Sequence, residues 1–415
     1  MSGLMFVSVL AAQAATAPLG AVPTPSATAS GDSSSNGAYT YVDLEAGAGY
    51  STNPNLDFGD NRGAGFGRIS VHGVHTRVSA RTTTVLSAFA QNSFYTRHYG
   101  AQQSFDLNAR HDARVSEKLR VFGDADFAYD KGGQLDTRII SVPGVPLPPG
   151  ATQPPLLTPV GDFLSVTGRR YSASAHIGAQ LALSAREFLS GSTGIEHSVF
   201  KNAGFDTKFT TIPVSIGYDR QISPRTTIGG RLGAQFTDYD GPAESRILTP
   251  QLTIQTLLAE HITFSGGIGV SFSAVDDGTD TRHSTGLAAN ANLCSAGERS
   301  RFCGYAAVSQ EAATVAGPAK TVSAGFDYSR RLDADQTLQF SISANRYSRP
   351  FSIISGQSFS HATYLRAAAD YTRHLGNRWF GGANVATRKV AQGGPDPKAD
   401  VSGSLYIRYR LGDLR

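Results

Sequence analysis

Apolar and polar residues alternate along this chain with a period of two, from about residue 40 almost to the carboxyl end. The segment 119–130 shows the pattern clearly. Val121, Phe127 and Tyr129 fall on one face, and Asp124 and Asp126 fall on the other. Only an extended strand separates residues in this way, because successive side chains of a strand point to opposite faces. The pattern therefore predicts an all-β protein.

The alternating segments number eighteen, and short polar turns alternate with longer connections between them. An even number of strands, short turns at one rim and longer loops at the other are typical of an outer-membrane barrel. We therefore predict a transmembrane antiparallel β-barrel of about 18 strands with both termini on the periplasmic side. The segments are expected to begin near residues 40, 62, 83, 101, 119, 166, 187, 208, 226, 246, 262, 282, 301, 318, 336, 361, 378 and 400.

A soluble β-sandwich or propeller would also show alternation, but its strands average only about five to six residues. A membrane-crossing strand needs about 9–11 residues, and these segments are long enough. Aromatic residues also gather at the ends of the apolar faces, where two interfacial girdles would form. The expected girdle residues are Tyr50, Tyr129, Tyr218, Phe236, Tyr328, Tyr371, Trp379 and Tyr409.

The chain divides into segments of different character. Residues 1–14 have an apolar core followed by small residues, which is typical of a signal peptide, and residues 15–38 have the composition of a flexible periplasmic linker. Residues 39–412 form the expected barrel, and the Pro-rich stretch 131–163 is expected to be a long extracellular loop that either narrows the pore or lies over its mouth. The expected location is the outer membrane of a Gram-negative bacterium, with its lipids as the surrounding partner.

Two prolines lie inside expected strands. Pro213 and Pro250 each remove a backbone donor from the ladder, so we expect a bulge or a strand end at each position.

The polar face of each strand would line an aqueous lumen, because a barrel of sixteen to eighteen strands is too wide for its own side chains to fill. Both signs of charge occur there, and no single sign dominates a ring, which favours neutral or weakly charged polar solutes. The predicted lumen-lining residues are Asp43, Glu45, Arg110, Asp112, Arg120, Asp124, Asp126, Arg170, Glu196, Arg231, Arg366, Asp370, Arg388, Arg408 and Arg410.

Composition and motifs narrow the function further. The 415 residues carry 37 Lys and Arg against 33 Asp and Glu, and the basic residues are scattered, so a nucleic-acid partner has no support. Cys294 and Cys303 flank a turn and are predicted to form a disulfide in an oxidising periplasm. The dispersed histidines predict no metal site, no cofactor motif is found, and the absence of a catalytic motif in its proper context predicts that the chain is not an enzyme.

Three stretches carry a resemblance to a known family. They are Gly49-Tyr50-Ser51-Thr52-Asn53, the hairpin from Asn108 to Tyr129, and the ending Leu405-Tyr406-Ile407-Arg408-Tyr409-Arg410-Leu411. Together they resemble the outer-membrane β-barrel porin family (beta-barrel porin-2 type) associated with bacterial exopolysaccharide secretion loci. The resemblance implies a conduit for an exported exopolysaccharide, which would dock on a periplasmic polysaccharide-export protein.

Two other functions fit the same pattern. A general diffusion porin would pass small polar solutes and show conductance without an export phenotype. A structural or adhesive barrel would show negligible conductance. The lumen would hold a glycan in an export conduit and a small polar solute in a diffusion porin.

Overall fold

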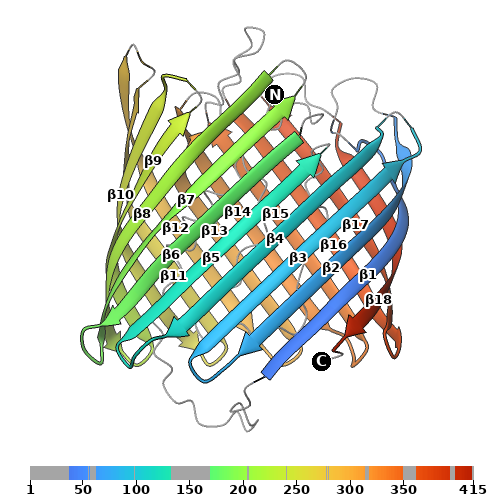
Figure 1. Cartoon of the computed structure of the whole chain (residues 1–415), viewed down its shortest axis with the longest axis horizontal. Helices are drawn as coiled ribbons and strands as arrows, with labels where there is room; N and C mark the ends of the chain where they lie inside the picture. Colours follow the sequence, from blue (N-terminus) through green and yellow to red (C-terminus); the bar gives the residue numbers. More distant parts are fainter. Residues whose placement is uncertain are drawn as a thin grey trace.

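The computed structural model describes residues 37–413, except 55, 57–61, 98, 132–168, 203–204, 240, 277, 279, 314–316, 349–360 and 393–397. Its elements in this range are eighteen strands (Figure 1). They are β1 (Gly37–Ser51), β2 (Ala64–Val78), β3 (Thr82–Tyr95), β4 (Ala101–Arg114), β5 (Leu119–Lys131), β6 (Arg169–Ala182), β7 (Glu187–Asn202), β8 (Phe205–Ser223), β9 (Thr226–Tyr239), β10 (Glu244–Ala259), β11 (Ile262–Asp276), β12 (Thr281–Ala296), β13 (Ser300–Ala313), β14 (Gly317–Arg331), β15 (Gln336–Ser348), β16 (His361–Gly376), β17 (Trp379–Gln392) and β18 (Asp400–Gly412).

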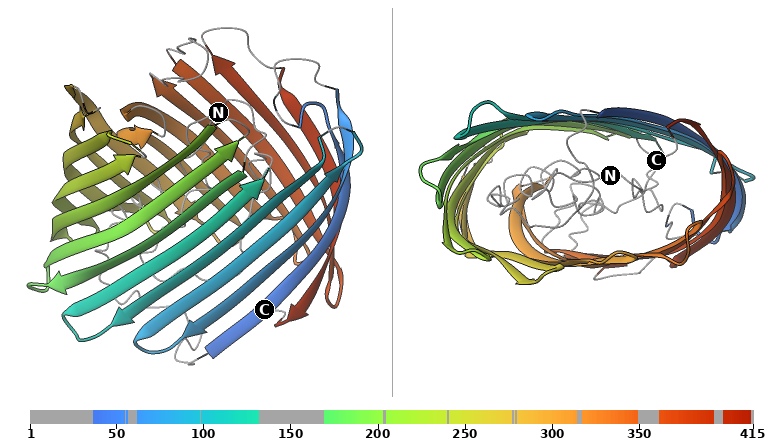
Figure 2. Two further views of the ribbon diagram at one scale, coloured as in Figure 1. Left: turned by 45° about the horizontal axis from the view of Figure 1, so that its top comes forward. Right: turned by 90° about the horizontal axis from the view of Figure 1, so that it is seen from below.

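All the strands form one antiparallel sheet that closes on itself. Each strand pairs with the next in sequence, and β1 also pairs with β18, from Tyr41 opposite Gly412 to Ser51 opposite Ser402. Seen along its axis, the barrel has a flattened, oval outline (Figure 2). The predicted fold class is therefore confirmed, including the number of strands and the return of β18 to the rim from which β1 starts.

Every strand begins within three residues of its predicted start. The largest differences lie at β1, β6 and β8. Gly37 and Ala38 belong to β1 rather than to the expected linker, and Lys131 ends β5 rather than opening the Pro-rich loop. The expected signal peptide, the rest of the linker and residues 132–163 of the loop lie outside the described residues.

The barrel is apolar outside and polar inside. Leu252, Leu405 and Ile268 are 71%, 70% and 61% exposed, whereas Glu196 and Asp400 are 1% and 0% exposed. A protein in water shows the opposite arrangement, because burying an ionised group costs more than exposing an alkyl chain. An apolar exterior around a closed sheet suits lipid, where every backbone donor and acceptor must find its partner within the protein. The chain is an outer-membrane β-barrel.

The turns at the rim where β1 starts are short and share a side-chain cap. Ser79, Ser116, Ser184 and Ser223 each accept a backbone N–H from two or three residues further on, at 3.0–3.4 Å. Asp333 does the same for Asp335 at 2.8 Å. A Ser or Asp at the start of a tight turn offers the backbone this bond locally, so these residues end one strand and direct the chain into the next. Short turns are typical of the periplasmic rim.

The prediction for the two prolines is wrong. Pro213 pairs with Gln235 and Pro250 with Leu232 in the middle of their strands. On the other side of each proline two residue pairs are missing from the ladder, and the register continues unshifted beyond them. Each strand accommodates its proline because only one neighbour loses a hydrogen bond, and the long strand holds the register on both sides. The three register shifts lie instead at the ends of strands, beside the short turns after Gln221, Leu257 and His374.

Within the described part of the chain, no helix is long and apolar enough to cross a membrane.

A charge placed on the outer face should destabilise the barrel more than the same charge placed inside. We predict that Ile268→Arg lowers the free energy of unfolding by about 2–4 kcal/mol, the cost of an arginine near the bilayer midplane. The matched variant Ser265→Arg, on the inner face of the same strand, should cost much less. Equilibrium urea unfolding in lipid vesicles measures both values. Equal losses for the two variants would contradict the assignment of the faces.

Candidate functional site

All fifteen predicted lumen-lining residues lie on the inner face of the wall, alternating with the apolar residues of the outer face. Most of them fall into two sectors. One sector, the seam sector, consists of β16, β17, β18, β1 and β2, where the sheet closes. The other, the acidic sector, consists of β4 to β7. The remaining predicted residue, Arg231, lies on β9, outside both sectors.

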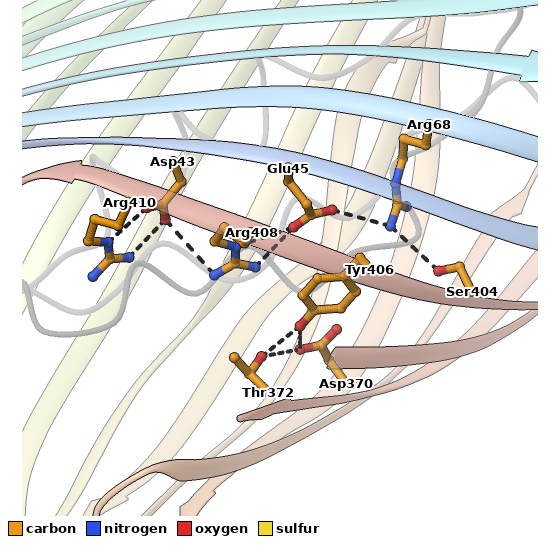
Figure 3. A network of polar contacts seen from close by, with 9 residues as sticks. All are labelled: Asp43, Glu45, Arg68, Asp370, Thr372, Ser404, Tyr406, Arg408 and Arg410. Carbon is orange, nitrogen blue, oxygen red and sulfur yellow. Dashed lines mark hydrogen bonds and ion pairs between the residues drawn. The ribbon is translucent and has the colours of Figure 1, made fainter. Parts of the chain in front are cut away.

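The seam sector contains a ladder of alternating charges (Figure 3). Arg410 binds both oxygens of Asp43, at 2.7 and 2.8 Å. Arg408 reaches Glu45 at 3.2 Å and Asp43 at 3.9 Å, and Arg68 of β2 reaches Glu45 at 3.6 Å. Three arginines thus enclose two carboxylates across the last, first and second strands. Every charge in the ladder has a neighbour of opposite sign, and the set carries one positive charge in excess, so it presents no large patch of one sign to a solute.

Aromatic groups enclose one end of this ladder. The guanidinium of Arg410 lies 4.2 Å from the ring centre of Tyr41 and 5.2 Å from that of Phe380. A cation over the face of an aromatic ring is attracted by the ring's negative π face. Arg410 is therefore held by a bidentate ion pair and two rings, and its head is fixed against the wall.

A second polar group continues the seam sector along β16. Tyr406 donates its hydroxyl to Asp370 at 3.0 Å, and Thr372 donates to the same carboxylate oxygen at 3.0 Å. The hydroxyls of Thr372 and Tyr406 lie 2.7 Å apart. Figure 3 shows the three side chains beside the ladder. These three side chains add two hydroxyl groups and one carboxylate to the inner face beside the ladder.

At the opposite rim, the β1–β2 connection is tied to the wall by one buried ion pair. Arg388 of β17 binds Asp400 of β18 at 2.7 Å, and the two side chains are 2% and 0% exposed. The other oxygen of Asp400 accepts the Ser51 hydroxyl at 2.6 Å and the Asn53 backbone N–H at 2.9 Å. Arg388 also donates to the carbonyl of Pro54 at 3.0 Å. The pair satisfies the polar groups of the connection and holds it on the inside of the wall.

Apolar contacts reinforce this attachment. Leu56, two residues after Pro54, is buried with Tyr364 of β16 and Val390 of β17. Tyr364 is wholly buried, although it points to the inner face. The residues from Asn53 to Leu56 that the structure describes therefore cover part of the inner wall at the outer rim, and they reduce the open cross-section there.

The acidic sector is held by pairs between neighbouring strands. Arg120 of β5 binds Asp112 of β4 at 2.7 Å, and Asn108 donates a short hydrogen bond to Asp126. His176 of β6 lies between two carboxylates, with Nδ1 2.9 Å from Asp124 and Nε2 3.2 Å from Glu196. The imidazole therefore links β5 and β7 through β6, with each ring nitrogen hydrogen-bonded to one carboxyl group.

The remaining predicted lumen residues lie opposite residues of neighbouring strands. Arg110 is opposite Asp124, and Arg170 is opposite Asp130. Arg231 on β9 is opposite Gly217, and Arg366 on β16 is opposite Arg388. No ring of one charge results from this arrangement.

The inner face of β10 to β12 differs from both sectors. From Ser245 to Gln255 on β10, along β11, and from Ser284 to Cys294 on β12, it carries no charged side chain and consists mainly of hydroxyl, amide and glycine positions. We call this surface the neutral wall. Its hydroxyls bond across strands, as in Thr249 with Ser271 at 3.0 Å and Ser273 with Ser284 at 2.6 Å.

The eight predicted girdle residues all lie on the outer face. Tyr50, Tyr218, Phe236 and Trp379 are 54%, 41%, 47% and 46% exposed, and the others are half-buried. Some pack against neighbouring rings, as Trp379 does with Tyr409 and Tyr129 with Tyr171, with centres 4.7 and 5.0 Å apart. Tyr218 and Tyr371 direct their hydroxyls to Glu187 and Gln336 near the short turns.

The structure also joins the two cysteines. Cys294 of β12 is directly opposite Cys303 of β13, and a disulfide links them across the hairpin.

Sequence reasoning missed several residues of the interior. Arg68 and His176 alternate with apolar neighbours on β2 and β6, so the same period-two pattern identifies them. Asp400, Tyr364 and Asn53 give no such signal. Their importance depends on contacts between the first connection and the last strands, more than 300 residues apart in the chain.

Among the residues that the structure describes, no three His, Cys, Asp or Glu side chains gather in a group that could hold a metal ion.

Comparison with known proteins assigns the chain to no family. No family model matches the sequence, and no curated protein does. Solved structures that it resembles include the FrpB iron transporter from Neisseria meningitidis (F3-3 variant), with 7% identity over 90% of this chain and 81% of that one, and a TM-score of 0.44. Pseudomonas aeruginosa OccK2 (OpdF) has 8% identity over 91% of this chain and 98% of that one, also with a TM-score of 0.44.

The buried pair beneath the β1–β2 connection should stabilise the barrel far more than an exposed one. We predict that Asp400→Ala lowers the free energy of unfolding by about 3–5 kcal/mol, because it leaves Arg388 buried and unpaired. The control Glu244→Ala removes the acidic residue of an exposed ion pair. The side chains of Arg246 and Glu244 in this pair are 70% and 58% exposed. That variant should cost less than about 1 kcal/mol. Urea unfolding of both variants in lipid vesicles tests the difference, and similar losses would show that the pair does not anchor the connection.

Proposed function

We propose that this barrel conducts an uncharged, hydroxyl-rich substrate across the outer membrane, and that the substrate is an exopolysaccharide on its way out of the cell. The observation that carries the proposal is the neutral wall. Its serine, threonine, asparagine and glutamine side chains offer both donors and acceptors, so a sugar hydroxyl can exchange one partner for the next along the wall. No fixed charge on this surface would hold the chain in place.

The charged sectors support the same substrate class. Selection for ions needs a ring of one sign in the narrow part of a pore. Here the seam ladder sets two carboxylates among three arginines, and His176 lies between Asp124 and Glu196. Charges that are already paired attract a charged solute weakly.

Export is the direction that the family resemblance implies. In that case the periplasmic rim, with its short capped turns, is the surface on which a periplasmic polysaccharide-export protein would dock. Short turns leave this rim open and even, which suits a partner that continues the conduit into the periplasm.

A general diffusion porin for small polar solutes is the second candidate. It is favoured by the described residues of the β1–β2 connection that lie on the inner wall at the outer rim, Asn53, Pro54 and Leu56. A narrower passage suits a small solute as well as a single extended glycan chain.

The two candidates differ in what a strain without this gene secretes. We predict that deletion abolishes surface polysaccharide and causes polymer to accumulate in the periplasm, and that the wild-type gene restores secretion. Quantification of secreted and periplasmic polysaccharide measures this, with an empty-vector strain as the control. Unchanged polymer together with slower uptake of small sugars would contradict the export role and favour the porin.

A further inference from the structure

The wall of the barrel is incomplete between β12 and β13. The two strands pair from Ala296 opposite Arg301 to Ala289 opposite Val308, and the pairing stops there. Neither strand ends at that point. β12 extends to Thr281 at the outer rim and keeps its partner β11 over that length, while Ser309–Ala313 of β13 lie beyond Val308 and stay paired with β14.

The outer end of the β13–β14 hairpin lies inside the barrel. Figure 2 shows it, in orange, bending inward from the ring of the other strands. It comes close to β10 and β11, which are not its neighbours in the sheet. The hairpin therefore leaves the wall at about Val308 and crosses in front of the neutral wall.

Gln310 seats the hairpin on the inner face of β12. Its Nε2 donates to the Ser284 hydroxyl at 3.2 Å. A Cβ atom at Gly286, which shares the inner face with Ser284, would lie only 2.8 Å from the same nitrogen. The glycine thus provides the space that the amide occupies. The face of β13 that would point outward in the wall now rests on the inside of the neighbouring strand.

The side chains of the hairpin explain why it leaves the wall. Gln310 is opposite Lys320 in the β13–β14 register, and both belong to the outward-facing set. Continued by two residues, the β12–β13 register would place Gln310 opposite Leu287, which is 49% exposed on the apolar exterior. An amide and an ammonium at this level would face lipid, and burying polar groups there without partners is unfavourable. In the lumen both groups remain in a polar environment.

We propose that the outer end of the β13–β14 hairpin sets the aperture of the channel, and that Gln310, lodged between Gly286 and Ser284, is the positioning residue that holds it in the lumen. Beyond Val308 the passage for a solute is then bounded by the hairpin, which covers the outer part of the neutral wall, and by the seam sector on the other side; nearer the periplasmic rim the neutral wall itself borders the passage. The inference concerns the width of the pore and holds for either solute class named above.

The test is the single-channel conductance in KCl of purified protein in planar bilayers, a readout that does not depend on the transported solute. Gly286→Leu fills the space of the Gln310 amide and should displace the hairpin, so conductance should rise above wild type. The control is Gly233→Leu on the inner face of β9, where a Cβ would meet nothing closer than the Thr249 carbonyl at 3.9 Å. It adds the same bulk to the lumen, so conductance should be unchanged or lower.

A double variant tests the same contact independently of Gly286→Leu. Gln310→Leu combined with Lys320→Leu makes the outward positions compatible with lipid, so the hairpin should return to the wall beside β12 and conductance should rise. The shift of folded barrels on unheated gels verifies folding of each variant. A conductance at or below wild type in the folded variants would overturn the proposal.

Discussion

The structure depends on one constraint, which is that the backbone of a chain in lipid must pair all its donors and acceptors with itself. An open sheet cannot meet it, because each edge strand leaves a row of groups without partners. At its closure this chain meets it by pairing β1 with β18 along eleven residue pairs, from Tyr41 to Ser51, whereas the outer part of β12 has no β13 partner beyond Ala289. That pairing joins the first and last strands of the barrel, which are separated by most of the chain. The seam carries the densest set of ion pairs described in the interior.

Closure also determines what the interior must contain. A barrel of this many strands encloses more space than its own side chains fill, so the inner positions face water and carry polar residues. Those residues come close together, and charged neighbours then neutralise one another across strands, as Asp43 and Arg410 do at the seam. The neutral wall of β10 to β12 meets the same requirement without charge. The lumen thus has both charged sectors and an uncharged polar wall, and this difference is the physical basis of the proposal that it conducts an uncharged substrate.

Much of the fold could be predicted from the sequence, because the period-two alternation reports directly which face of each strand meets lipid. It predicted the number of strands, their starts to within three residues and the inward face of the fifteen charged residues named from it, but it left out Arg68 and His176. The partners of those charges could not be predicted. Glu45 and Arg408 are 363 residues apart, and their contact depends on the register at which the barrel closes. Alternation also continues through Gln310 and Lys320, so it cannot show that their hairpin leaves the wall. The polar character of these two outward positions was the available signal.

The central claim is that the barrel is a water-filled channel whose interior charges are mutually neutralised. The most direct test is the reversal potential of purified protein in a planar bilayer with a KCl gradient across it. The account predicts a steady conductance with a reversal potential close to zero, because paired charges select weakly between cations and anions. The absence of conductance, or a reversal potential near the limit for one ion, would contradict it.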